Sequence, residues 1–240
     1  MELKEKIILV VGGAAGIGRA TALLCAERGA QVVVADLDEQ AGWQVAAEAG
    51  GVFLQVDVCD EASVQAMARA IDQRYGRLDV LIHTAGVLLG AFTPLEDFQA
   101  DTFRKVIEVN VTGSFLCVKH CTPLIRKSES GVVILTSSGA ATGGSSSFAY
   151  GSSKGAVNSL AVTLANRLQV EGIRVNVLSP GNIDTAMKRS VLAADVERHG
   201  KTMEDAVAES HLGTPEGVAK VLAWLASDEA DYVRGIIQTR

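Results

Sequence analysis

Short apolar runs of strand length alternate with longer amphipathic stretches along the whole chain. Most of the runs are rich in β-branched residues, and four are apolar at consecutive positions, which is typical of strands buried on both faces of a parallel sheet. The runs lie at residues 7–11, 32–35, 52–56, 80–82, 132–135 and 173–178. The alternation predicts an α/β fold with a doubly wound parallel sheet and helices on both of its faces.

The stretches between these runs carry the start and stop signals of helices. One helix is predicted from near Ile17 to Gly29, and a second from 61 to 75 with Gly76 as its stop. Leucines 160, 164 and 168 repeat at helical spacing in a segment that ends near Gly172. Thr214 followed by proline predicts a capped helix start. Its expected buried face is Val218, Val221, Leu222 and Leu225.

No linker, charge block or internal repeat divides the sequence, so residues 1–240 are predicted to form a single domain. Residues 186–213 are longer than an ordinary helix–strand connection and contain a helical pattern of their own. In a doubly wound fold such an insertion usually covers the ligand, which makes it the expected substrate-binding segment. Lys188 and Arg189 within it either meet an anionic group or are solvated. His199 and His211 are either solvated, which is the favoured interpretation, or in contact with substrate.

Composition narrows the class of protein. Of 240 residues, 48% are hydrophobic and 21% charged, which excludes a disordered chain or a coiled coil. The net charge is −6, so nucleic acid and anionic membranes are poor partners. No apolar run approaches the roughly 20 residues that span a bilayer. Residues 1–18 are interpreted as a buried first strand and not a signal peptide, because Gly12 and Gly13 break the apolar run.

The four cysteines show no spacing typical of a disulfide framework and predict reduced thiols in a cytoplasmic protein. Cys117, His120 and Cys121 share a helical face that can present three metal ligands. No fourth ligand accompanies them, and helical cysteine is usually a small packing residue, so no metal site is predicted.

The first predicted strand leads into a glycine-rich turn, Gly12-Gly13-Ala14-Ala15-Gly16-Ile17-Gly18, which opens a helix. Such glycines allow the backbone to approach a diphosphate, and the helix N-terminus supplies free N–H groups. Asp36 ends the second strand, where an acid is expected to bind the ribose hydroxyls of adenosine and repel a 2′-phosphate. Leu37 follows it, and no basic residue lies in the turn. The cofactor predicted is NAD rather than NADP.

Tyr150 and Lys154 lie one helical turn apart and therefore share a face. A tyrosine with an ordinary pKa near 10 is a poor base at neutral pH. An ammonium about 4 Å away, at an effective dielectric constant of about 20, attracts the phenolate by about 4 kcal/mol. The pair therefore predicts a tyrosine whose pKa is lowered toward the range of general acid–base catalysis.

With these motifs in this order, the sequence resembles the short-chain dehydrogenase/reductase family over nearly its whole length. The remaining markers are Asp57-Val58, Ala85-Gly86, Asn110-Val111-Thr112-Gly113, Ser137-Ser138, and Pro180-Gly181 with Thr185. The resemblance implies a Rossmann-like sheet of about seven strands. It also implies Tyr150 as acid/base, Ser138 binding the substrate oxygen, Lys154 holding the nicotinamide ribose, and Asn110 relaying protons through water. The cofactor contacts that it implies are Gly12, Gly16, Ile17, Gly18, Asp36, Asp57, Val58, Ala85, Gly86, Asn110, Tyr150, Lys154, Pro180, Gly181, Ile183 and Thr185.

The choice between Ser137 and Ser138 depends on where the count begins. The family often places its serine thirteen residues before the tyrosine, which selects Ser137. Counting from the strand start selects Ser138, because a strand fixes side-chain direction whereas a loop can lose a residue. We select Ser138 and place a one-residue deletion in the loop at 145–147.

Three departures from the family pattern bear on these expectations. Val11 replaces the usual threonine that braces the glycine turn. His83 and Thr84 replace the usual pair of asparagines; His83 is expected to serve as a polar brace without a catalytic role. The sequence given stops at Gln238-Thr239-Arg240, without the family's usual tail, which puts one of two subunit interfaces in doubt.

The function expected is NAD-dependent interconversion of a secondary alcohol and a ketone. The alternatives are an NADPH-dependent 3-oxoacyl reductase, which Asp36 argues against, and a non-catalytic dinucleotide sensor, for which a complete proton relay has no use. The partners expected are a small-molecule substrate and other copies of the chain, as a dimer or tetramer. Apolar positions in excess of a sheet-facing stripe, including Phe115, Val118, Val162 and Leu168, indicate a helical interface.

Overall fold

Seven parallel strands form one central sheet in the computed structural model, which describes residues 2–239. Met1 and Arg240, and with the latter the expectation about the chain end, lie outside the described residues. The order is β3-β2-β1-β4-β5-β6-β7, so the predicted doubly wound sheet is confirmed. The strands are β1 (Ile7–Val11), β2 (Gln31–Asp36), β3 (Val52–Gln55), β4 (Val80–His83), β5 (Val132–Thr136), β6 (Arg174–Ser179) and β7 (Gly235–Gln238).

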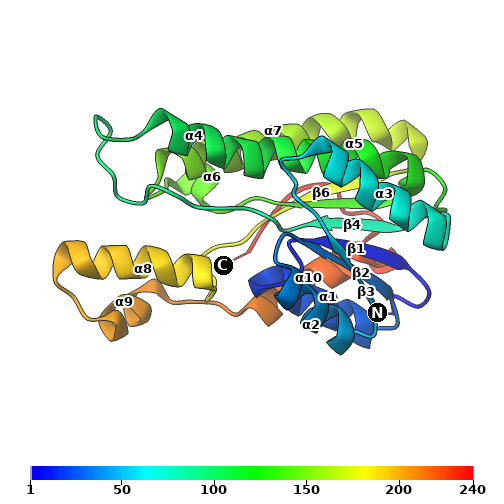
Figure 1. The fold of residues 1–240 in the computed structure, drawn as a ribbon, viewed down its shortest axis with the longest axis horizontal. Helices are drawn as coiled ribbons and strands as arrows, with labels where there is room; N and C mark the ends of the chain where they lie inside the picture. The colour runs from blue at the N-terminus through cyan, green and yellow to red at the C-terminus, as the bar shows by residue number, and fades with distance from the viewer. Residues whose placement is uncertain (1, 240) are drawn as a thin grey trace.

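Helices cover both faces of this sheet (Figure 1). Alternate strand residues point to opposite faces. Leu9 therefore packs in a cluster with α3, α5 and α7, and Ile8 in a second cluster with α1, α2 and α10. The first layer contains α3 (Glu61–Tyr75), α4 (Ala100–Ile107), α5 (Gly113–Ile125), the short α6 (Ala140–Gly143) and α7 (Phe148–Leu168). The second contains α1 (Gly16–Glu27), α2 (Glu39–Glu48) and α10 (Pro215–Ala226).

Most predicted helix ends are found where the sequence placed them. α3 spans 61–75, and Gly76 ends it in the left-handed conformation. The Thr214 side chain accepts a hydrogen bond from the Gly217 amide and caps α10. On α10, Val218, Leu222 and Leu225 are buried, whereas Val221 is only partly buried. α2 was not predicted, and Asp38, which caps it by accepting from the Ala41 amide, was its main sequence signal.

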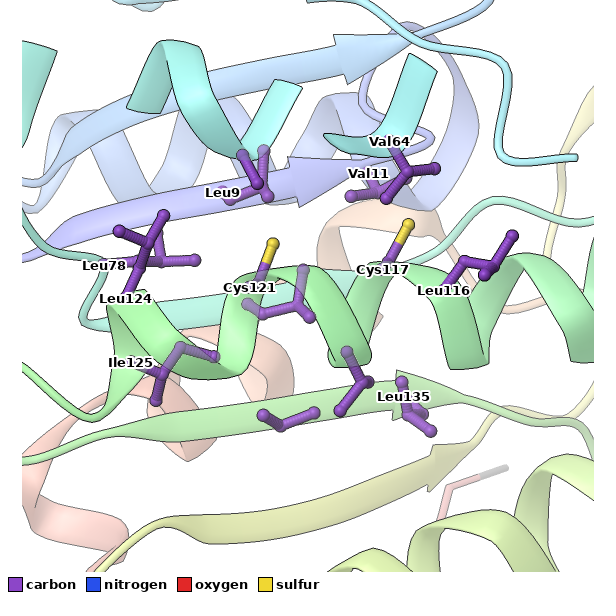
Figure 2. Close-up of a cluster of buried hydrophobic side chains, with 14 of the residues drawn as sticks. Leu9, Val11, Val64, Leu78, Leu116, Cys117, Cys121, Leu124, Ile125 and Leu135 are labelled. Carbon is purple, nitrogen blue, oxygen red and sulfur yellow. The ribbon is translucent and has the colours of Figure 1, made fainter. Parts of the chain in front are cut away.

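Cys117 and Cys121 are core residues of the first layer. Figure 2 shows both sulfur atoms on the side of α5 that faces Leu9 and Val11. His120 lies off this face, with its Nε2 atom 2.8 Å from a Glu61 carboxylate oxygen. The three candidate ligands are thus separated. Within residues 2–239 there is no grouping of histidine, cysteine and acidic residues suited to a metal ion.

The segment at residues 186–213 contains two helices, α8 (Ala186–His199) and α9 (Met203–Ser210), where one was predicted. In Figure 1 they extend past the sheet, at the end where α6 and the segment before α4 also lie. Ile183 and Gly213 pair as an isolated parallel bridge and close the base of the segment. No helix within the described part of the chain is long and apolar enough to cross a bilayer.

Candidate active site

A cavity of about 860 Å³ opens at the carboxyl edge of the sheet, between the turns that follow β1 and β4. The strand order reverses here, which is where doubly wound folds bind ligands. Nearly all predicted site residues line it. They are Gly12, Gly16, Ile17, Gly18, Asp36, Asp57, Val58, Ala85, Gly86, Ser138, Tyr150, Lys154, Pro180, Gly181, Ile183 and Thr185. Asn110 is fully buried beside this wall and does not form part of it.

The glycine turn fits tightly against the end of β4. Gly12 has a φ of +79°, and a Cβ atom there would lie 2.4 Å from the Ala85 amide nitrogen, so the position requires glycine. The Thr84 hydroxyl donates to the carbonyl oxygens of Val11 at 2.8 Å and Gly12 at 3.1 Å. Thr84, directly after β4, thus supplies the brace that Val11 cannot. This contact was not predicted from the sequence, in which Thr84 stands only as a departure from the family's usual pair.

The N-terminus of α1 provides the hydrogen-bond donors that a diphosphate needs. Its N-cap residue is Ala15, which has no side chain to occupy the first amide groups. Ala15, Gly16 and Ile17 all line the cavity. The uncapped helix end, with its positive dipole, therefore fits a dinucleotide diphosphate.

Two carboxylates at the end of the cavity that is predicted to hold adenosine are fixed by backbone amides. One Asp36 oxygen accepts from the Ala14 amide at 2.9 Å, and the other accepts from the Asp38 amide at 3.1 Å. An Asp57 oxygen accepts from the Cys59 amide at 2.9 Å. Asp36 therefore lies against the glycine turn, where its negative charge suits ribose hydroxyls and disfavours an added phosphate.

Helix α7 brings Tyr150 and Lys154 to the opposite end of the site. Ser147 caps this helix by accepting from the Tyr150 amide, and the Lys154 Nζ atom donates to the Thr136 carbonyl at 2.8 Å. Nζ lies 5.6 Å from the centre of the Tyr150 ring. Burial lowers the pKa of Lys154 to about 8.

The prediction that the chain's own residues lower the pKa of Tyr150 is wrong. Burial raises the pKa of Tyr150, and a hydrogen bond with the Ser138 hydroxyl opposes this only in part. Attraction to an ammonium lowers the pKa of a phenol, whereas the cost of burying a phenolate raises it. The Lys154 ammonium group is hydrogen-bonded to the Thr136 carbonyl.

The two adjacent serines differ in their partners. Ser137 is buried, and its hydroxyl donates to the Lys154 carbonyl at 2.9 Å. Ser138 lies one residue on, is partly exposed to the cavity, and is the serine whose hydroxyl meets the Tyr150 phenol. This geometry favours Ser138 over Ser137 as the partner of Tyr150.

Asn110 lies in a π-helical turn, Glu108–Thr112, between α4 and α5. Its amide nitrogen donates to the Val87 carbonyl and the Ser153 hydroxyl, both at 2.9 Å, and its side-chain oxygen accepts from the Val87 amide. A Cβ atom on Gly86 would lie 3.1 Å from the Asn110 oxygen and 3.4 Å from Lys154 Nζ. Gly86 therefore leaves room beside the cavity for both the Asn110 amide and the Lys154 ammonium group.

His83 is a buried, neutral side chain that supports the turn carrying Asn110. Its Nδ1 atom lies 3.3 Å from the Ser114 hydroxyl, which in turn donates to the Asn110 carbonyl. Burial and the nearby Lys154 lower the pKa of His83 to about 3. It braces the turn that carries Asn110 and does not reach the cavity wall.

The chain is similar in sequence and in structure to known proteins. A family model described as "Enoyl-(Acyl carrier protein) reductase" matches residues 12–238. Cis-4-hydroxycyclohexanecarboxylate dehydrogenase of Sinomonas cyclohexanicum is 38% identical over 97% of this chain and 94% of its own. Tropinone reductase-like 2 of Erythroxylum coca is 35% identical over 98% and 88%. The crystal structure of levodione reductase superposes with a TM-score of 0.88 at 30% identity, covering 98% and 96%.

These relatives are named as dehydrogenases and reductases, and each matches nearly the full length of the chain. The predicted resemblance is thereby confirmed, together with the expectation of a nicotinamide dinucleotide, NAD or NADP, as the family's cofactor. The chain belongs to the short-chain dehydrogenase/reductase family.

Proposed function

We propose that the protein is an NAD-dependent oxidoreductase that interconverts a secondary alcohol and a ketone. One observation carries the proposal: Ser138, Tyr150 and Lys154 line the same cavity as the uncapped N-terminus of α1. This places acid–base chemistry beside a site suited to a dinucleotide. When bound, the nicotinamide dinucleotide supplies or takes up the hydride of the reaction.

Tyr150 is the proposed acid/base, which donates a proton to the substrate oxygen during reduction and removes it during oxidation. The Ser138 hydroxyl, which bonds the phenol, holds the substrate oxygen next to it. Lys154 is proposed to bind the nicotinamide ribose and favour the phenolate by its charge. Asn110, which lies on the same side of Gly86 as Lys154, is proposed to complete a proton relay through water to Lys154.

The preference for NAD rests on Asp36. Its carboxylate lies against the glycine turn, and the next residue, Leu37, is apolar and exposed. The 2′-phosphate of NADP would be repelled by the Asp36 carboxylate at a cost of several kcal/mol, and neither Asp36 nor Leu37 supplies a cation to offset it. This opposes the alternative of an NADPH-dependent 3-oxoacyl reductase.

The substrate is proposed to be a small molecule held under residues 186–213. Met187 and Val191 of α8, with Phe92 from the segment after β4, give the cavity an apolar wall. One relative is named for a hydroxycyclohexanecarboxylate, which makes alicyclic alcohols a reasonable class to assay first. We further propose a cytoplasmic homo-oligomer, dimer or tetramer.

The proposed subunit surface differs in part from the sequence expectation. Phe115 of α5 and Val162 of α7 are exposed and remain candidates for an interface between copies. Val118 and Leu168 are buried within the subunit itself, because both face the sheet-side cluster. The expected interface is therefore narrower than the sequence indicated.

Initial rates of NADH formation over a panel of secondary alcohols test the proposal. We expect turnover with NAD exceeding that with NADP for at least one alcohol of the panel. A protein that binds NAD tightly but turns over no alcohol or ketone would instead support the alternative of a non-catalytic dinucleotide sensor.

A further inference from the structure

Five charged side chains line the cavity. Asp36, Asp57 and Lys154 have predicted roles, whereas Lys105 and Lys188 do not. Asp36 and Asp57 are fixed by backbone amides at the adenosine end. Lys105 lies 3.8 Å from the Cys59 sulfur, beside Asp57, and Lys154 donates to the Thr136 carbonyl next to Tyr150. Lys188 is the fifth, and the proposed mechanism makes no use of it.

Lys188 lies in the first turn of α8, between two apolar residues that share the cavity wall. Met187 precedes it, and Val191 follows one turn later. Its side chain is partly buried, and burial lowers the pKa of Lys188. No ion pair joins it to a carboxylate within residues 2–239. The charge of Asp195, two turns on, raises the pKa of Lys188 and so opposes burial in part. The Asp195 carboxylate itself lies 2.9 Å from His199 Nδ1.

The neighbouring Arg189 provides the contrast. It is exposed and pairs with Asp184 through two hydrogen bonds, at 2.6 and 2.8 Å. It does not line the cavity. Of the two basic residues that begin this helix, Arg189 is paired outside the cavity. Lys188 lines the cavity, and within residues 2–239 its ammonium group makes no hydrogen bond or ion pair at contact distance. A partly desolvated cation attracts an anion more strongly than a solvated one does.

Helix α8 lies across the substrate side of the cavity. Thr185, its N-cap, approaches the glycine turn, because a Cβ on Gly16 would lie 3.3 Å from a Thr185 methyl group. Near its other end, Arg198 donates to the Phe92 carbonyl at 2.8 Å, and Phe92 lines the cavity. Helix α8 thus extends from the glycine turn at one side of the cavity to Phe92 at the other.

We propose that Lys188 binds a carboxylate on the substrate, so that the protein acts on a secondary hydroxy acid, or the matching keto acid, whose acid group lies apart from the reacting carbon. This rests on the proposed function. The cofactor's diphosphate is the other possible anion, and α1 already offers it an open helix end. Helix α8 offers no such end, because the Thr185 hydroxyl accepts from the Lys188 amide.

Matched substrates test the proposal. Each pair consists of a secondary hydroxy acid and its primary amide: 3- and 4-hydroxycyclohexanecarboxylate and 4-hydroxypentanoate. We expect the best pair to favour the acid by about 10- to 100-fold in kcat/KM, the range of a charge-assisted hydrogen bond. Lys188→Met should bring the ratio close to one and Lys188→Arg should restore most of it. Arg189→Met, the matched control, should keep it.

Two further measurements distinguish failure of this proposal from failure of the proposed function. Calorimetric binding of each acid and amide to the NADH-loaded protein decides the role of Lys188 without turnover, and acids that bind no tighter than amides overturn it. The Kd for NAD, measured on Lys188→Met, tests whether Lys188 binds the cofactor's diphosphate instead. A tenfold weaker affinity for NAD, together with an unchanged acid-to-amide ratio of kcat/KM, would show that it does and would overturn the proposal. If no pair is turned over but the acids still bind more tightly than the amides, the proposed function is contradicted and the role of Lys188 is not.

Discussion

Lys154 is a buried cation, and its cost to stability predicts a pH dependence that can be measured. Burial lowers the pKa of Lys154 from 10.5 to about 8, a change of about 3 kcal/mol between its two protonation states. Between these two pKa values the unfolded chain holds a proton that the folded chain has released. The free energy of unfolding therefore rises with pH in this window.

Replacing Lys154 with methionine removes this contribution. From about pH 7 to about pH 9.5, the wild type should gain about 2 kcal/mol of unfolding free energy relative to Lys154→Met. Urea unfolding followed by circular dichroism measures the difference at each pH. The buried thiols, whose pKa values lie far higher, titrate in both proteins and cancel. Lys220→Met, at an exposed position, is the matched control. Parallel curves for wild type and Lys154→Met would refute the account of a desolvated ammonium.

Three other predictions concern the cofactor, the thiols and the assembly. Asp36→Ala should lower the NAD-to-NADP ratio of kcat/KM by about 100-fold, since it removes a repulsion of several kcal/mol; equal use of both cofactors by the wild type would contradict this. Iodoacetamide should label Cys59 before the three buried cysteines, and NAD should slow the labelling, because Cys59 lines the cavity; mass spectrometry showing no protection would argue against the proposed adenosine position. Sedimentation should give a dimer or tetramer that Val162→Glu weakens, whereas a wild-type monomer would rule out the proposed surface.

The sheet could be predicted from sequence because its signals are local and repeated. Six of seven strands coincide with apolar runs, and Gly76 ends α3 by its own backbone conformation. β7 (Gly235–Gln238) was not among these runs, because alternate residues of this edge strand are exposed. Parallel strands bring their carboxyl ends to one edge of the sheet, and residues after β1, β4 and β5 accordingly line one cavity.

Contacts between distant residues could not be predicted in the same way. Asn110 bonds Val87 and Ser153, which lie 23 and 43 residues away, and it does so from a π-helical turn that periodicity does not reveal. The brace from Thr84 depends on the register of β1 against β4. The pKa of Tyr150 is raised rather than lowered because burial outweighs the hydrogen bond with Ser138, and burial is a property of the folded chain.

The central claim is that the Tyr150 hydroxyl carries the proton of an alcohol–ketone interconversion. Tyr150→Phe keeps the ring and removes only that hydroxyl. We predict a fall in kcat of about 10²- to 10⁴-fold with the best alcohol of the panel, while the Kd for NAD stays within about twofold. Tyr232→Phe, at a fully exposed position, is the control and should match the wild type. Retention of more than about a tenth of kcat by Tyr150→Phe would contradict the account.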